Sequence, residues 1–521
     1  MKNASLRKNI YSILIIISLG LIAGRILSVE NVSFQELQKW RKQQISKILQ
    51  EKEKEFRARE IPSGTDLAAR EARFAKTQQK RQENLERDAT LLFPFFSSND
   101  RSRWCTIRAL VEPEMRVPGA PYSIDLVHLE KGYNTIDMVK HNDHLYSSKP
   151  PLFPTMIAGI YWLIYHLGFS MAEHPFEVAR AILLITNIPM MLIFLLSITA
   201  LAERLGKSDW DRIFIVAAAC FTTYMTTFCI TLNNHLPAVM SVSITLYLAI
   251  KIIMDRQFKW SSVFLIGLFG TFATVNELPA LSFLVAILFA VILYLPWKES
   301  FAKSLGLCGT MLAGTAIITS AFFYTNYLAH GTFSPPYAKR HKTDPENSWY
   351  FYQYTDHQGK LRDSYWQNPQ GMDRGEPSCV TYAFHCLFGH HGIFSLTPIW
   401  LLAFPGLYIW SLYGLTAEED QKLRIQLFSL MIFTLTVIIC VFYIFRPLHD
   451  RNYGGNTSGL RWCFWLMPLW LCAMLPTLEK MEKYFILRSL ALILLFFSAI
   501  SVAYPSWNPW VHPWIFTILG Y

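Results

Sequence analysis

Long apolar blocks alternate with polar segments along the chain. Segments such as 181–201 (AILLITNIPMMLIFLLSITAL) and 429–445 (SLMIFTLTVIICVFYIF) contain no charged residue and are long enough to cross a bilayer as helices. We therefore predict an all-α polytopic membrane protein with about eleven transmembrane helices. After residues 1–28, these helices are expected at 179–201, 213–232, 236–254, 261–276, 278–296, 304–325, 394–414, 425–445, 462–477 and 485–503.

The segment 151–169 (PLFPTMIAGIYWLIYHLGF) decides the topology, because it sets the side of every later connection. If it lies along the membrane surface, the basic connections all fall in the cytoplasm, as the positive-inside rule requires. If it crosses, the same connections fall outside. We therefore predict a juxtamembrane helix, and a first helix that is not cleaved and has a cytoplasmic N-terminus. The basic connections are 203–212, 251–259, 297–303, 417–424 and 479–488.

This topology places several polar segments on one extracytoplasmic face. They are 29–170, 232–236, 275–279, 326–393 and 446–462. Transmembrane helices fill the regions 171–325 and 394–521. Within the first loop, 34–90 predicts a charged helical hairpin without a wide apolar stripe, with Thr65 or Asp66 capping its second helix. We expect a solvated hairpin, and a docking or oligomerisation arm is the alternative.

The composition fits this class of protein. Hydrophobic residues make up 52% of the chain, and the net charge of +10 is of the kind that marks cytoplasmic loops rather than a nucleic-acid partner. The nine cysteines are scattered and lack zinc-site spacing. Cys379 and Cys386 share one polar loop and could form a disulfide if that loop is extracytoplasmic.

The segment 97–112 (SSNDRSRWCTIRALVE) holds the first candidate for catalysis. Asp100 follows a Ser-Ser-Asn turn and precedes an amphipathic helical stretch. A carboxylate just outside the membrane can act as a general base toward a hydroxyl or amine. On spacing alone, the favoured interpretation is that Asp100 caps the helix, since aspartate is preferred there.

The segment 141–154 (HNDHLYSSKPPLFP) holds the second candidate. Its double proline forces an abrupt entry into the next helix, and Lys149 stands at that entry. The Lys149 ammonium could meet a phosphate or lipid headgroup, or it could extend to the interface without a specific role. Asp143 and Tyr146 are candidate substrate contacts, although Asp143 could also be solvated.

The segment 452–462 (NYGGNTSGLRW) combines glycines with an arginine. Gly454 and its neighbour allow close approach of the backbone, and the Arg461 guanidinium could hold a phosphate with two hydrogen bonds. Arg451 is a second candidate for phosphate binding, and Asn452 is a candidate for the substrate pocket. A tight turn with an arginine at the membrane edge is the alternative.

Four further ionisable residues lie next to apolar blocks. Glu277 and His235 are isolated between predicted transmembrane helices, where such groups are usually functional, although a hydrogen-bonded loop explains each equally well. His390 and His391 are adjacent, which is not the spacing of a metal-binding helix. We expect these two histidines to line a pocket.

In order, these segments resemble the GT-C superfamily of membrane glycosyltransferases, in the branch of the protein O-mannosyltransferases and the lipid A aminoarabinose transferases. NDRSRWCTIRALVE resembles the Asp-Glu-x-Arg-Tyr segment of that branch, and YSSKPPLFPTMIAGIYWL resembles its Tyr-x-x-Lys-Pro-Pro-Leu segment. NYGGNTSGLRWCFWLMPL is similar to its late Gly-Gly…Gly-x-Arg-Tyr…Pro element. The chain departs from the pattern at Arg101, which replaces the second acidic residue, and in the charged hairpin.

The resemblance implies a GT-C-like fold and transfer of a hexose or pentose from a polyprenyl-phosphate donor. Asp100 would be the base of an inverting displacement, and Lys149, Arg461 and Arg451 would bind the donor phosphate. The acceptor would be a lipid, a glycan or a protein. No cofactor is predicted, and a divalent metal stays open. The enzyme would lie in the cell (inner) membrane with its active site on the extracytoplasmic side.

Two other functions stay open from the sequence. A transporter or flippase of a lipid-linked or small substrate would be expected to show internal repeats, which we do not find in the sequence. A non-catalytic scaffold for envelope assembly would use the charged hairpin as its docking arm.

Overall fold

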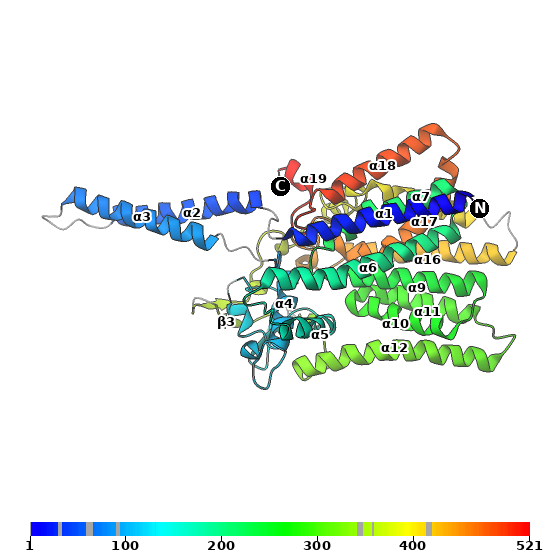
Figure 1. The fold of residues 1–521 in the computed structure, drawn as a ribbon, viewed down its shortest axis with the longest axis horizontal. Coiled ribbons are helices and arrows are strands. Elements are labelled where there is room, and N and C mark those ends of the chain that lie inside the picture. The colour runs from blue at the N-terminus through cyan, green and yellow to red at the C-terminus, as the bar shows by residue number, and fades with distance from the viewer. Residues whose placement is uncertain are drawn as a thin grey trace. The chain divides into compact units, whose positions relative to one another are not determined.

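The computed structural model describes residues 2–29, 34–58, 66–89, 94–130, 132–340, 347–356, 359–412 and 419–520. It divides into two compact units. The large unit comprises Met1–Leu27 and Phe95–Tyr521, and the small unit comprises Ser28–Pro94. The predicted all-α class is confirmed, since long helices dominate the large unit (Figure 1).

The small unit is a helical hairpin of α2 (Phe34–Arg57) and α3 (Leu67–Ala89). The rings of Phe56 and Phe74 stack with centroids 4.0 Å apart, which joins the two helices. The Asp66 carboxylate caps α3 by accepting hydrogen bonds from the N–H groups of Ala68 and Ala69 at 3.0 and 3.2 Å. The alternative cap, Thr65, lies outside the described residues. No described side chain of the hairpin is buried, as its charged sequence predicts.

The large unit contains a helix in each predicted apolar block. These helices are α1 (Lys2–Leu27), α6 (Pro175–Leu205), α7 (Asp209–Phe221), α9 (His235–Asp255), α10 (Trp260–Asn276), α11 (Leu281–Tyr294), α12 (Phe301–His330), α15 (Ala403–Leu412), α16 (Glu419–Ile444), α17 (Met467–Met481) and α18 (Phe485–Ala503). Among the described residues, 7 helices are long and apolar enough to cross a membrane. Other apolar helices are shorter, so the number of crossings stays a prediction.

One predicted helix, 213–232, is interrupted. α7 ends at Phe221, and only the short α8 (Met225–Phe228) follows before α9. The hydroxyls of Thr222 and Thr223 bond to the carbonyls of the preceding turn at 2.7 and 3.0 Å, which competes with regular helix propagation. The Asn187 amide then satisfies carbonyls that the break releases, among them that of Cys229 at 2.7 Å.

The connections predicted to share a side do lie together. Arg204 pairs with Asp255, and Lys207 lies 3.4 Å from Glu479. A further link is the hydrogen bond that Arg424 donates to the Ile253 carbonyl at 2.8 Å. Figure 1 shows the N-terminus at this end of the helices, and α4 (Ser98–Val111) and α5 (Leu152–His166) at the opposite end. Which end faces the cytoplasm stays a prediction.

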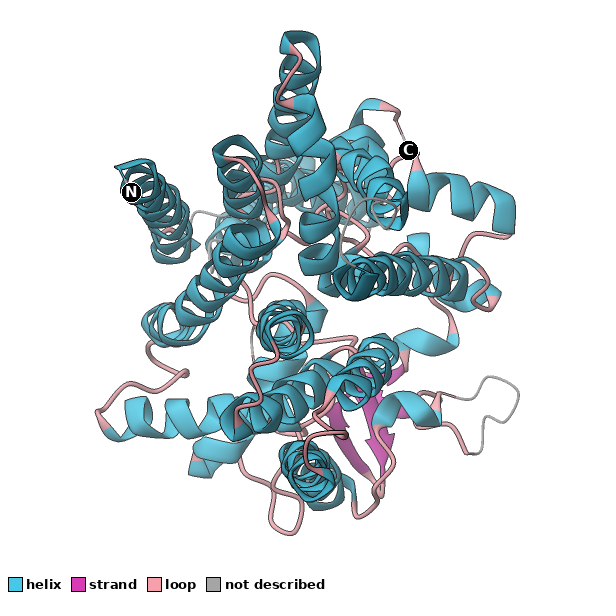
Figure 2. Cartoon of the chain, turned by 90° about the vertical axis from the view of Figure 1, so that its right-hand side faces the viewer, coloured by secondary structure: helices cyan, strands magenta, loops and turns pink. Residues whose placement is uncertain are grey.

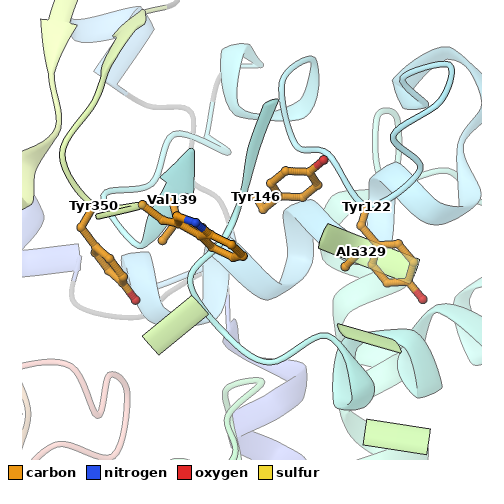
Figure 3. Packing of buried hydrophobic residues seen from close by; sticks show 6 residues of the cluster. Tyr122, Val139, Tyr146, Ala329 and Tyr350 are labelled. Carbon is orange, nitrogen blue, oxygen red and sulfur yellow. The ribbon is translucent and has the colours of Figure 1, made fainter. Parts of the chain in front are cut away.

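The end that carries α4 and α5 also holds two short antiparallel strand pairs, drawn in magenta in Figure 2. They are β1 (Met138–His141) with β2 (His144–Ser147), and β3 (Gln353–Thr355) with β4 (Leu361–Asp363). The short helices α13 (Cys379–Leu387), α14 (Ile393–Leu396) and α19 (Trp514–Ile518) complete the described part of this unit. A small core joins the first strand pair to the end of α12 (Figure 3), and it consists of Tyr122, Val139, Tyr146, Ala329, Trp349 and Tyr350.

The pairing of Cys379 with Cys386, left open by the sequence, does not occur. Both thiols are free and lie on α13, seven residues apart. Two such positions are about 10 Å apart along a helix axis, which is beyond the reach of a disulfide.

Candidate active site

A polar cavity of about 740 Å³ lies where α4, the double-proline step and the 452–462 loop converge. Most of its walls come from segments that are far apart in the sequence but were predicted to share one face. The cations that line it are Arg101, Arg103, Lys149, Arg340, Arg446 and Arg461. The carboxylates that line it are Asp137, Glu277, Asp373 and Asp450. Cations thus exceed carboxylates by two among the described lining residues.

Lys149 and Asp137 form an ion pair at the cavity wall. The ammonium nitrogen lies 3.0 Å from the Asp137 carboxylate, and the two side chains are 20% and 13% exposed. Both remain accessible to a ligand in the cavity. Burial lowers the pKa of Lys149 to about 8, and the nearby Asp137 opposes that shift.

Arg103 and Glu277 are joined through one amide. Arg103 donates a hydrogen bond to the Asn234 side-chain oxygen at 2.6 Å, and the Asn234 amide nitrogen donates to Glu277 at 2.6 Å. Arg103 also donates to the carbonyl of Asn99 at 2.7 Å, one turn earlier on α4. Burial lowers the pKa of Arg103 to about 10, which leaves the guanidinium charged at neutral pH.

His235 connects the same carboxylate to a second arginine. Its Nδ1 contacts Glu277, and its Nε2 lies 3.2 Å from the Arg461 guanidinium. Because arginine can only donate, Nε2 is the acceptor and Nδ1 carries the proton that is donated to Glu277. Glu277 thereby orients both Arg103, through Asn234, and Arg461, through His235.

The glycine loop holds Arg461 by its backbone. The guanidinium donates to the carbonyl of Gly454 from Nε at 3.1 Å and from a terminal nitrogen at 3.0 Å. Gly454 has φ +92, and a Cβ there would lie 3.3 Å from the Arg461 Nε. Gly459 packs against the Tyr224 ring, where a Cβ would lie 2.9 Å away. These contacts explain why this turn is glycine-rich.

The catalytic role expected for Asp100 finds no support in this geometry. Asp100 is 0% exposed and does not line the cavity. It forms a capping box with Ser97 at the start of α4, and its carboxylate accepts N–H hydrogen bonds from Phe96 and Ser97 at 3.1 and 2.8 Å. Burial raises its pKa to about 6, against the effect of these hydrogen bonds. The geometry therefore favours the helix-capping interpretation.

Three other expected site residues also lie away from the cavity lining. Arg451 donates to the carbonyls of Arg446 and Pro377, both at 2.9 Å, and so fastens two loops together. Asp143 is fully exposed in the turn between β1 and β2. Tyr146 is buried in the small core of Figure 3. Their roles in phosphate or substrate binding stay predictions.

The adjacent histidines form a separate buried cluster. The rings of His385 and His390 stack 3.9 Å apart, and His391 stacks on Tyr453 at 5.2 Å. Burial lowers the pKa of His390 to about 4 and that of His391 well below its usual value. Neither His390 nor His391 lines the polar cavity, and their pocket-lining role stays a prediction. Within the described part of the chain, no group of three or more His, Cys, Asp and Glu residues is arranged to hold a metal.

Among the remaining candidates, Lys149, Glu277, Arg461 and Asn452 line the cavity, and His235 lies directly behind it. Asn452 donates to Asp373 at 2.5 Å. Asp137 and Arg103 were not among the site residues predicted from the sequence. Arg103 lies four residues after Asn99, a helical spacing that could have placed the two side chains together. Asp137 carries no comparable signal. It directly precedes β1, and its carbonyl accepts a hydrogen bond from the Ser148 N–H at 3.0 Å, next to Lys149.

An apolar groove of about 860 Å³ borders the polar cavity. It runs between α9, α11 and α16 and shares the lining residues Leu278, Pro279 and Phe442 with the polar cavity. Its lining on α16 extends from Arg424 to Phe442. That helical distance is about 27 Å, close to the hydrocarbon thickness of a bilayer.

No protein-family model matches the chain, and no curated protein matches its sequence. In structure, 81% of the chain is similar to 50% of the Archaeoglobus fulgidus oligosaccharyltransferase in complex with Zn and sulfate, at 11% identity and a TM-score of 0.43. The apo form of that enzyme gives a TM-score of 0.40 at 11% identity, with 80% and 53% of the two chains covered. A complex of the archaeal oligosaccharyltransferase AglB, also from Archaeoglobus fulgidus, with an inhibitory peptide and a dolichol-phosphate gives 0.36 at 9% identity, with 80% and 52% covered.

The chain therefore spans about half the length of the solved structures it matches. The likeness is a distant one, with every TM-score below 0.5. At this distance it transfers neither an activity nor the role of any residue.

Proposed function

We propose that the protein is a membrane glycosyltransferase that moves a sugar from a polyprenyl-phosphate donor to an acceptor hydroxyl or amine. The observation that carries the proposal is the junction of the cationic cavity with the apolar groove at Leu278, Pro279 and Phe442. An amphiphile with one phosphate and a long hydrocarbon chain matches this junction. The phosphate would lie among the cations, and the chain would follow the groove toward Arg424.

The charge of the cavity supports a phosphate as the leaving group. Lys149, Arg103 and Arg461 line it with Asp137 and Glu277, which leaves one positive charge in this inner group. A sugar phosphodiester carries one negative charge, and cleavage of its anomeric C–O bond adds a second as the phosphate leaves with the electron pair. Cations already held in place stabilise this developing charge without reorganisation.

Asp137 is the proposed general base, in place of Asp100. The acceptor oxygen would attack the anomeric carbon, and its proton would pass to the Asp137 carboxylate as the bond to phosphate breaks. Glu277 suits this role less well, because its Oε1 already accepts from Asn234 and His235. The single displacement inverts the anomeric centre.

The acceptor class is a lipid, a glycan or a protein, and the reaction is proposed to occur at the extracytoplasmic face of the cell membrane. The direct test is to extract lipid from the purified full-length protein and identify it by mass spectrometry. A polyprenyl-phosphate sugar in that extract, with release of polyprenyl phosphate when acceptor-containing membranes are added, supports the proposal. A protein that accumulates the lipid-linked sugar in sealed vesicles but releases no polyprenyl phosphate would be a transporter.

A further inference from the structure

A second cationic group lies in the same cavity, apart from the contacts that hold Lys149, Arg103 and Arg461. Arg340 and Arg446 meet at Asp450, with N–O distances of 3.2 and 2.6 Å. The arginine side chains are 27% and 36% exposed, and the carboxylate between them is 12% exposed. All three line the cavity.

These two guanidiniums outnumber the carboxylate that they share. Each contacts Asp450 through one terminal nitrogen, whereas an arginine has five N–H donors in a rigid fork. His449 adds a further polar ring 3.7 Å from the same carboxylate. The group therefore keeps a positive charge and donors at the cavity wall, the combination that binds phosphate or carboxylate groups.

The second group is connected to the proposed base through Trp366. The Arg340 guanidinium lies over the Trp366 ring, 4.6 Å from its centroid. The Trp366 indole donates a hydrogen bond to the carbonyl of Ile136 at 2.9 Å, next to Asp137. An acceptor anchored by Arg340 and Arg446 would thus lie on the side of the cavity that carries the base. In the opposite orientation, the donor sugar would contact Arg340 and Arg446. A neutral sugar has no anionic group for their positive charge to bind.

We propose that the acceptor carries an anionic group, and that Arg340 and Arg446 bind it while Asp137 accepts the proton from the reacting group. This inference rests on the proposed function and adds the acceptor's charge to it. A purely structural role, in which the arginines only tie residue 340 to the 446–450 loop, is the competing explanation, and a binding experiment separates the two.

The experiment uses the full-length protein in detergent and two soluble probes. Dodecyl phosphate occupies the inner cations, and glucose 6-phosphate or glucose is then titrated by calorimetry. We expect glucose 6-phosphate to bind at least tenfold more tightly than glucose. Arg340→Gln and Arg446→Gln should each remove most of that preference while leaving the affinity for dodecyl phosphate unchanged, which also shows that the variants are folded.

Arg362→Gln is the matched control, since Arg362 pairs with Asp356 at 2.8 Å on β4 and does not line the cavity. Equal binding of the two sugars by the unsubstituted protein would overturn the inference, and so would a preference that survives both substitutions. Failure of dodecyl phosphate to bind at all would instead contradict the proposed function.

Discussion

The ammonium nitrogen of Lys149 lies 3.0 Å from the Asp137 carboxylate, at the wall of a cavity that adjoins an apolar groove. A lysine at the double-proline step was expected to meet a phosphate, and its partner in this structure is a carboxylate. In the proposed reaction, the ammonium binds the donor phosphate and Asp137 then acts as the base. One ion pair would thus supply both the phosphate-binding cation and the general base.

Replacing Lys149 should weaken donor binding in a pH-dependent manner. The charged amine binds phosphate, and burial lowers its pKa to about 8, so it is protonated below that pH and loses its charge above it. In the unsubstituted protein, KM for the donor should therefore be flat below about pH 7 and rise up to about tenfold per unit well above pH 8. Lys149→Met should raise KM at least tenfold at pH 7, and Lys149→Arg should remove the rise near pH 8. A profile that is the same for Lys149→Arg and the unsubstituted protein would contradict this role.

Substitution of His235 should weaken donor binding, because His235 helps to position Arg461. His235→Ala removes the acceptor of the 3.2 Å contact from Arg461 and the proton donated to Glu277. A hydrogen bond to a charged group contributes about 1.5–3 kcal/mol, so KM for the donor should rise about tenfold or more. The pH dependence set by Lys149 should stay unchanged. A variant with normal KM but greatly reduced kcat would point to a direct role for His235 in the reaction.

Gly454 offers a test of how Arg461 is held. Gly454→Ala places a Cβ 3.3 Å from the Arg461 Nε at a φ of +92, so the guanidinium should shift and transfer activity should fall about tenfold. Gly331→Ala is the control, because Gly331 also has positive φ, +67, but nothing lies within 4 Å of its Cβ position. Equal losses of activity in the two variants would mean that backbone strain alone is responsible.

Filling the apolar groove should weaken the binding of donors that have a long polyprenyl chain. Val285→Trp on α11 places a bulky ring in the groove, whereas Leu288→Trp lies on the same helix outside the groove lining. KM for a donor with a long polyprenyl chain should rise at least tenfold with Val285→Trp, and KM for a short, water-soluble donor analogue should change little. The measurement is a comparison of both donors on both variants. If both variants raise KM for the long donor equally, the groove does not hold the chain.

The sequence predicted the fold well because apolar block length and loop charge are local properties. It placed a helix in each apolar block, and the contacts among the basic connections bear out its grouping of those connections. The break after Phe221 was not predicted. Threonines are compatible with a membrane helix, and a helix breaks there only if another side chain accepts the role of binding the backbone carbonyls that lose their helical partners. That information arises only when Asn187 packs against the broken segment.

The site was predicted less completely. Lys149, Glu277, Arg461 and Asn452, all candidates from the sequence, line the cavity, and their roles stay predictions. The choice of Asp100 followed a short motif, but the same Ser-x-x-Asp spacing is that of a capping box, and only burial separates the two interpretations. Asp137 lies beside Lys149 because the chain folds back over β1 and β2, with the Ser148 N–H bonded to the Asp137 carbonyl, and the sequence around Asp137 does not indicate this contact.

The proposed mechanism depends on the claim that Asp137, and not Asp100, is the general base. The most direct measurement is sugar transfer from polyprenyl-phosphate donor by Asp137→Asn and Asp100→Asn, with dodecyl phosphate binding as the check of folding. We predict that Asp137→Asn lowers kcat by at least about a hundredfold, as expected for loss of a general base. Asp100→Asn should keep most of its activity, because an asparagine side-chain oxygen at this position of the capping box can still accept the hydrogen bond from the Ser97 N–H. Full activity of Asp137→Asn together with an inactive but folded Asp100→Asn would contradict this assignment of the base.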